Sequence, residues 1–240
     1  MLPASSTLFR TADPMDETVR QSLETTLRSG LPLDLLSTYK GVPVRYKASI
    51  QQIQGDAVTV STPEPEVVCL AVEREVVILG EGLAAALRAA VVEVQLARGI
   101  ARLIHIRRTD TRLNDRLVVR VEPRSPLPVR LEAAGQRVAA HLLNISLGGL
   151  AVEAFPENLA WPLQLRTPVR LSFTLPAGPV ELVGILSNVD VTAKTQRLGI
   201  AFPQDGQIQA IIRYVLERRV EILAELRVDY EARSASTATV

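Results

Sequence analysis

Cysteine is almost absent from this sequence, and its scarcity excludes an internal disulfide bond. The single cysteine, Cys69, lies among the apolar residues Val67, Val68, Leu70 and Val72. Apolar surroundings keep a thiol protonated and unreactive, because burial disfavours the charged thiolate. The sequence therefore predicts that Cys69 is a buried structural residue.

Long hydrophobic runs are also lacking. Arg88, Glu93 and Arg98 interrupt the most apolar region of the chain, so no stretch of about eighteen apolar residues is present that could span a membrane. The first ten residues do not show the basic start and apolar core of a secretory signal. We therefore expect a cytoplasmic protein that does not insert into a membrane.

Histidine is rare, and familiar catalytic motifs are missing. Only His105 and His141 occur, and there is no Gly-x-Ser-x-Gly elbow, no Walker glycine loop and no His-Glu-x-x-His pattern. The histidine nearest to Ser146 in the sequence is five residues away, a spacing that usually turns a strand residue to the other face. We expect neither an enzyme nor a metal site nor a cofactor.

Lysine is scarce, since it occurs only at Lys40, Lys47 and Lys194, so arginine carries most of the positive charge. Two explanations stay open: arginine forks suit bidentate recognition of anions, and a GC-rich genome favours arginine codons. The net charge is only +1 and the hydrophobic fraction is 47%. These values indicate a globular protein with a real core and disfavour a general nucleic-acid binder.

The N-terminal part of the chain combines one short helix with a series of strands. A loose arm is expected at the start, followed by an amphipathic helix over 16–28 that stops at Gly30. Residues 83–90 fit a helix or a strand equally well. The runs rich in valine and isoleucine predict a small all-β barrel, with strands at 42–50, 57–61, 67–72, 75–79 and 91–96.

A second set of short strands follows an arginine-rich segment, 97–116, that we expect to join two domains. Seven candidates at this spacing predict a closed or nearly closed barrel of six or seven strands, at 117–121, 129–131, 138–143, 149–152, 169–175, 180–191 and 198–202. Apolar residues then recur at helical spacing from Ile208 to Leu226, which predicts one long amphipathic helix. Its apolar stripe fits packing on the barrel better than a dimer seam, and residues 232–240 are expected to be disordered.

One turn stands out between two apolar runs, Asn144-Ile145-Ser146-Leu147-Gly148-Gly149. Glycine permits positive φ and lets a ligand approach the backbone. Upstream lie arginines whose fork-shaped donors match phosphate oxygens or the O6/N7 edge of guanine, at Arg107, Arg108, Arg112, Arg116 and Arg120. Together they predict a binding site for a guanine nucleotide anion.

These residues resemble the PilZ domain, a bacterial receptor module for cyclic di-GMP, with its Arg-x-x-x-Arg and (Asp/Asn)-x-Ser-x-x-Gly motifs. Asn144, Ser146 and Gly149 complete the second motif. The first motif has two registers: Arg107-Arg108 with Arg112, which we favour, or Arg116 with Arg120. The resemblance implies that arginines contact phosphates and guanine edges, that Asn144 and Ser146 bond to the ligand, and that Gly148 and Gly149 lie beneath it.

The order of domains resembles flagellar-brake proteins of the YcgR type, with an N-terminal split barrel. We therefore expect an arm and helix at 1–30, a barrel at 31–106 and a PilZ domain at 107–231. The resemblance implies a monomeric or homodimeric cyclic di-GMP effector that reorients its domains and acts on flagellar motility, polysaccharide secretion or biofilm formation. Two other hypotheses stay open, an adaptor that has lost the ligand and a nucleic-acid binder that uses the arginine segment.

Overall fold

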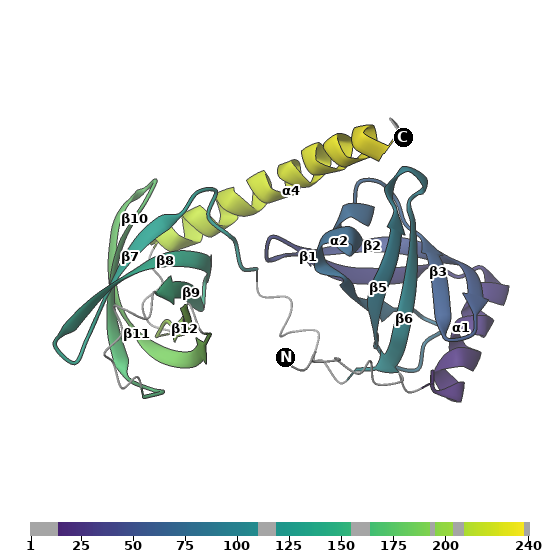
Figure 1. Ribbon diagram of the computed structural model, residues 1–240, viewed down its shortest axis with the longest axis horizontal. Coiled ribbons are helices and arrows are strands. Elements are labelled where there is room, and N and C mark those ends of the chain that lie inside the picture. Colours follow the sequence, from purple (N-terminus) through teal and green to yellow (C-terminus); the bar gives the residue numbers. More distant parts are fainter. Residues whose placement is uncertain (1–13, 110–118, 155–163, 193–194, 204–208, 238–240) are drawn as a thin grey trace, which may run out of the picture. The chain divides into compact units, whose positions relative to one another are not determined.

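The computed structural model describes residues 14–109, 119–154, 164–192, 195–203 and 209–237. The predicted N-terminal arm falls largely outside these ranges. Contacts divide the chain into two units, and each unit is built on a closed six-stranded barrel (Figure 1). The mainly β fold with two barrels in tandem and a long C-terminal helix is confirmed.

The first barrel closes in the strand order β1-β2-β3-β6-β5-β4. Its interior is filled by apolar side chains that alternate along the strands, such as Leu35, Val58, Ile78 and Leu103, all of which are fully buried. The strands are β1 (Leu33–Tyr39), β2 (Val42–Gln54), β3 (Ala57–Ser61), β4 (Glu75–Leu79), β5 (Leu87–Gln95) and β6 (Ile100–Arg108).

The predicted N-terminal helix is confirmed as α1 (Glu17–Ser29). The Asp16 carboxylate caps it by accepting hydrogen bonds from the backbone N–H groups of Thr18 and Val19, at 2.8 and 3.2 Å. Gly30 ends it in the left-handed region at φ 61°. The apolar positions that suggested this helix, Val19 and Leu23, are buried.

The strand predicted at 67–72 is wrong, because these residues form the short helix α2 (Val67–Glu73). Val67, Val68, Cys69 and Leu70 are all fully buried, and a short run that is apolar on every side does not distinguish a helix from a strand. Cys69 is buried as predicted, and this burial raises the pKa of its thiol to about 12. Of the two alternatives for residues 83–90, the strand is correct from Leu87 onward.

The segment predicted to join the barrels contains a strand of the first one. Residues Ile100–Arg108 form β6, which pairs with both β3 and β5. The joining segment is therefore shorter than the arginine spacing suggested. Arg112 and Arg116 lie outside the described residues.

The second barrel closes in the order β10-β11-β12-β9-β8-β7, with six strands, the lower of the two predicted numbers. Of the strand predicted at 117–121, the described part forms only an isolated bridge between Val121 and Ile145. The strands are β7 (Leu127–Ala133), β8 (Gln136–Ser146), β9 (Gly149–Ala154), β10 (Pro168–Leu175), β11 (Gly178–Val191) and β12 (Gln196–Ala201).

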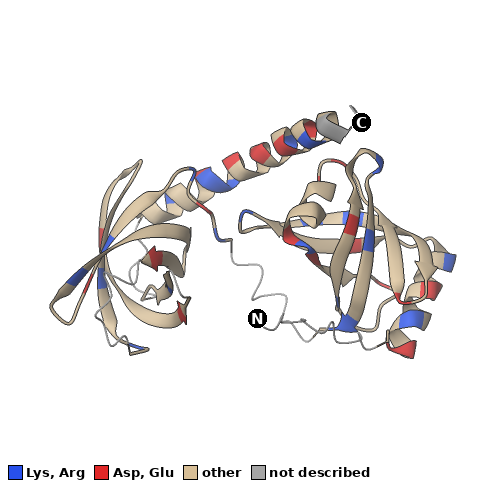
Figure 2. Ribbon diagram, viewed as in Figure 1, with Lys and Arg blue, Asp and Glu red and all other residues tan. Residues whose placement is uncertain are grey.

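The predicted C-terminal helix is confirmed as α4 (Gln209–Thr237), and it continues through residues 232–237, where disorder was expected. Ile211, Val215 and Ile222 form a buried stripe at helical spacing, and Arg218 lies within this stripe. Basic and acidic residues follow one another along α4 (Figure 2). None of the described helices is long and apolar enough to cross a membrane.

Candidate functional site

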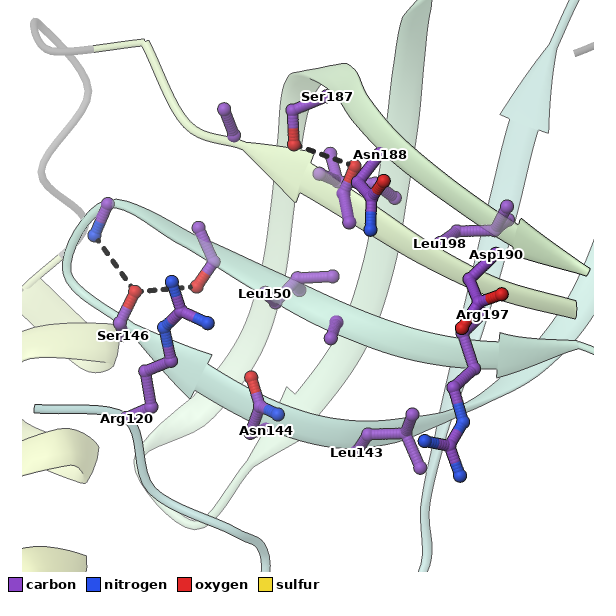
Figure 3. Close-up of a pocket in the computed structure, with 16 residues that line it drawn as sticks. Arg120, Leu143, Asn144, Ser146, Leu150, Ser187, Asn188, Asp190, Arg197 and Leu198 are labelled. Atoms are coloured by element: carbon purple, nitrogen blue, oxygen red, sulfur yellow. Dashed lines mark hydrogen bonds between the residues drawn. The ribbon is translucent and has the colours of Figure 1, made fainter. Parts of the chain in front are cut away.

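A pocket of about 570 Å³ lies on the second barrel, over β8, β9, β11 and β12 (Figure 3). Its volume falls in the range usual for small-molecule sites. All its lining residues belong to the second unit. Those with polar side chains are Arg120, Asn144, Ser146, Ser187, Asn188, Asp190 and Arg197.

Two β-bulges bring consecutive residues into this pocket. Successive side chains of a regular strand point to opposite faces, yet Leu143 and Asn144 both line the pocket, as do Ser187 and Asn188. The strand register shifts between Leu142 and Asn144 in β8 and at the corresponding place, between Leu186 and Asn188, in β11. Each bulge therefore re-aims one additional side chain toward the same cavity.

Ser146 shapes the two-residue turn between β8 and β9. It is buried, with 6% of its surface exposed. Its hydroxyl donates a hydrogen bond to the carbonyl oxygen of Gly149 at 3.0 Å and accepts one from the N–H of Gly148 at 3.3 Å. A hydroxyl has one donor and two acceptor positions, so Ser146 holds the turn and keeps one acceptor position for a ligand.

The glycines of this turn do not use the conformational freedom that the sequence suggested. Neither Gly148 nor Gly149 adopts the left-handed backbone region, so that expectation is wrong. Gly149 is required for another reason, because a Cβ there would lie 2.5 Å from the carbonyl oxygen of Ile200 on the neighbouring strand β12. A Cβ on Gly148 would meet no atom within 4 Å.

Arg120 belongs to a short segment that hydrogen bonds hold to strand β8 and to helix α4. Next to it, Val121 and Ile145 exchange two backbone hydrogen bonds of 2.9 and 3.0 Å. Glu122 follows, and its carbonyl oxygen accepts a 2.8 Å hydrogen bond from Nε of Arg218 on α4. The backbone that carries Arg120 is thus attached to β8 and to α4.

Arg218 can hold the backbone of Glu122 because its side chain is buried and two carboxylates neutralise its charge. Only 4% of the side chain is exposed, and Nη1 lies 2.9 Å from Glu221 and 2.6 Å from Glu225. The hydrogen bond from Arg218 lowers the pKa of Glu225 to about 2. The guanidinium therefore makes two ion pairs and a backbone hydrogen bond at once.

The charged side chains lie at two ends of the pocket. Figure 3 shows Arg120 beside Ser146 at the β8–β9 turn, and Asp190 beside Arg197 at the other end. Nε of Arg197 lies 3.5 Å from Glu153. The turn end offers a cation and small polar groups for an anion, whereas the other end offers both a donor and an acceptor.

The structure brings together part of the site that the sequence suggested. Arg120 lines the pocket together with the four site residues that the sequence suggested within 144–149, which are Asn144, Ser146, Gly148 and Gly149. Arg107 and Arg108 end strand β6 in the first unit, where Nη2 of Arg108 lies 4.0 Å from Asp16.

Sequence reasoning missed the residues from β11 and β12, which are Ser187, Asn188, Asp190 and Arg197. One indication was present in the sequence, because the polar pair Ser187-Asn188 interrupts the apolar run of β11. Its meaning depends on the bulge, which places two neighbours on one face. The structure therefore adds a second wall to the predicted site.

Known solved structures with a similar fold cover most of the chain. They include Bacillus subtilis MotI/DgrA, an inhibitor of motility, at 16% identity over 80% of this chain and 97% of that one, with a TM-score of 0.39. Escherichia coli YcgR in complex with c-di-GMP matches at 15% over 92% and 94%, with a TM-score of 0.36. The K. pneumonia MrkH–c-di-GMP complex matches at 13% over 90% and 95%, with a TM-score of 0.35.

The family comparison addresses the second unit directly. No curated protein sequence matches this chain. Residues 106–217 match the family model described as PilZ domain. This range contains the whole second barrel, the bulged strands and the turn with Asn144 and Ser146. The second barrel of this chain therefore matches the PilZ domain family.

Proposed function

We propose that the second barrel binds cyclic di-GMP in this pocket and that the chain is a cyclic di-GMP effector rather than an enzyme. One observation carries the proposal: Arg120 lines the same cavity as the turn that holds Asn144 and Ser146. The PilZ resemblance assigns this pairing of arginine and turn to cyclic di-GMP, a dianion. Charge-assisted hydrogen bonds from arginine suit both its phosphates and its guanine edges.

The residues of the turn have distinct roles in this proposal. Arg120 binds a phosphate or the O6/N7 edge of guanine. Asn144 offers an amide donor and acceptor, and Ser146 offers its remaining acceptor position. Gly148, with open space around it, lets the ligand approach the backbone. Gly149 maintains the close pairing of β9 and β12 beneath the site.

Two arginine registers compete for the first motif. The place of Arg120 in the pocket supports the register Arg116-x-x-x-Arg120. The register of Arg107, Arg108 and Arg112 stays a prediction, since Arg107 and Arg108 end a strand of the first unit and Arg112 lies outside the described residues. Separate variants distinguish the two registers.

Isothermal titration with cyclic di-GMP tests the proposal. Arg120→Ala is expected to weaken binding about thirtyfold, because a charge-assisted hydrogen bond contributes about 2 kcal/mol. Arg170→Ala, an exposed arginine on β10 that does not line the pocket, is the matched control. Arg108→Ala combined with Arg112→Ala tests the other register. The absence of heat with the wild type at tens of micromolar ligand would refute the receptor function.

The output of binding is a second step of the proposal. We expect the ligand to change the orientation of the two units and thereby the surface offered to a protein partner in the flagellar motor or the polysaccharide secretion machinery. Small-angle X-ray scattering with and without ligand measures the reorientation. A pull-down that recovers the same partner regardless of cyclic di-GMP, from a protein that does not bind it, would favour the adaptor.

A further inference from the structure

A carboxylate lies in the wall of a pocket that we propose for an anion. Asp190 is the only acidic residue among the described residues that line the pocket, which also includes Arg120 and Arg197. A carboxylate repels phosphate and accepts hydrogen bonds without donating any. Asp190 therefore has to face a part of the ligand that carries hydrogen-bond donors.

Strand geometry directs Asp190 toward the same space as Asn188. The two residues are two positions apart on β11, so their side chains leave the same face of the strand, with their Cα atoms roughly 7 Å apart. Both line the pocket, and Figure 3 shows Asp190 beside Arg197, at the end away from Arg120. A ligand that fills the pocket from Arg120 to this end therefore meets both residues.

The acceptor capacity of Asp190 is not used by the parts of the chain that the structure describes. Its side chain is exposed, and none of the described residues donates a hydrogen bond to it. Arg197 is its partner in the β11–β12 register, yet the guanidinium of Arg197 forms its ion pair with Glu153, at 3.5 Å. As far as the described residues are concerned, both oxygens of the Asp190 carboxylate are thus available to a ligand.

The chemistry of the bases decides which ligand group fits a bare carboxylate. The Watson–Crick edge of guanine presents two adjacent donors, N1–H and the N2 amino group, which match the two oxygens of a carboxylate. Adenine presents an acceptor at N1 instead, which a carboxylate repels. The amides of Asn144 and Asn188 each carry a donor and an acceptor, so they suit either base.

We propose that Asp190 accepts hydrogen bonds from N1–H and N2–H of a guanine base and is the residue that selects guanine over adenine. This inference rests on the proposed binding of cyclic di-GMP. Arg120 then supplies affinity for the phosphate side of the ligand, and Asp190 supplies base specificity at the other end. Guanine pairs both of its donors with the carboxylate, whereas adenine places the N1 acceptor against it, and this difference gives the contact its selectivity.

The test compares cyclic di-GMP with cyclic di-AMP on three proteins by isothermal titration: the wild type, Asp190→Asn and Glu181→Gln. Asparagine preserves the shape of Asp190 but replaces one of the two acceptor oxygens that pair with guanine by an NH₂ donor, which can pair with N1 of adenine. Glu181 is an exposed carboxylate on the same strand that does not line the pocket. It controls for the loss of one negative charge.

The wild type is expected to bind cyclic di-AMP at least about tenfold more weakly than cyclic di-GMP. Asp190→Asn is expected to bind cyclic di-GMP about tenfold more weakly, to gain affinity for cyclic di-AMP, and so to lose most of the preference. Glu181→Gln should behave as the wild type does. A wild-type preference that survives in Asp190→Asn overturns this inference and leaves the receptor function intact. A wild type that binds neither nucleotide overturns both.

Discussion

The two barrels share one topology, but the turn between their second and third strands has different surroundings in each. The first barrel closes as β1-β2-β3-β6-β5-β4, and the second, read from its first strand, closes as β7-β8-β9-β12-β11-β10. Strands β8 and β9 therefore correspond to β2 and β3, and each pair is joined by a two-residue turn. A feature that both pairs of strands share belongs to the fold, and a feature found only at the β8–β9 turn belongs to the binding site.

The bulge is a property of the scaffold. The second strand shifts register in both barrels, between Ile50 and Gln52 in β2 and between Leu142 and Asn144 in β8. In the first barrel the bulge only exposes glutamines to solvent, whereas in the second it adds Asn144 to the pocket. The fold thus supplies the geometry, and the residue type decides whether a site results.

In each barrel an arginine from a helix forms hydrogen bonds to the barrel, but the two arginines bind different segments. In the first, Arg20 of α1 bonds to the β2–β3 turn itself, with Nη1 2.7 Å from the carbonyl oxygen of Gly55 and Nη2 2.8 Å from Asp56. In the second, Arg218 of α4 bonds to Glu122, behind the segment that carries Arg120. The equivalent turn of the second barrel is left to face the pocket.

The largest expected effect comes from Arg218→Ala. This change removes a buried side chain, its ion pairs with Glu221 and Glu225, and the hydrogen bond to Glu122. We expect the free energy of unfolding to fall by about 3 kcal/mol. Urea unfolding followed by circular dichroism measures the change, and a loss below about 1 kcal/mol would contradict the anchoring role.

A pH titration of the same variant sharpens this prediction. Hydrogen bonds from Arg218, the stronger cause, and from Lys40 together depress the pKa of Glu225 from 4.5 to about 2 in the folded protein, and Arg218→Ala removes the stronger of the two. A depressed carboxyl pKa stabilises the fold above the unfolded value and loses that contribution as the pH falls through the folded one. The stability difference between wild type and Arg218→Ala should therefore narrow from pH 4.5 toward pH 2. A difference that stays constant would mean that packing alone is lost.

The sequence predicted the parts of this fold that depend on local patterns. Helix α1 could be located from the spacing of Val19 and Leu23 and from Gly30 at its end, since capping and periodicity are local properties. The motif of Asn144 and Ser146 was equally visible. The presence of Arg120 in the pocket was not visible, because it depends on where β6 ends and the second barrel begins.

The second wall of the site could not be predicted for a similar reason. Asn188 and Asp190 enter the pocket because β11 is bulged and lies beside β12, and both features are set by strand pairing across the barrel. Helix α2 was mistaken for a strand because its four buried residues leave no polar face to reveal a period. Long-range pairing and complete burial are what the pattern of one segment does not encode.

The next largest loss of stability is expected for Gly149→Ala in the second barrel. Comparison with Gly55→Ala in the first barrel separates the cost of a packing clash from the cost of a strained turn. Gly149→Ala would place a Cβ 2.5 Å from the carbonyl oxygen of Ile200 and push β9 away from β12, at a cost of about 2 kcal/mol. Gly55→Ala in the first barrel has free space and is strained only by its φ of 58°, at a cost of about 1 kcal/mol.

Thermal and urea unfolding of both variants check this order. Gly148→Ala is the matched control, since its Cβ meets no atom within 4 Å and its φ is not in the left-handed region. It should change the free energy of unfolding by less than about 0.5 kcal/mol. If Gly148→Ala and Gly149→Ala lowered the free energy of unfolding equally, the close contact between position 149 and Ile200 would not be what makes glycine necessary there.

Of the two arginine replacements, Arg20→Ala is expected to have the smaller effect, and it tests whether the two equivalent turns differ in function. The Arg20 side chain is 26% exposed and bonds to the partly exposed Asp56, so its loss should lower the free energy of unfolding by only about 1 kcal/mol. Binding of cyclic di-GMP should stay at the wild-type level, because the turn that Arg20 closes belongs to the first barrel. If titration instead showed weaker binding by Arg20→Ala at unchanged stability, the first turn would take part in recognition, and the division into a closed turn and a binding turn would be wrong.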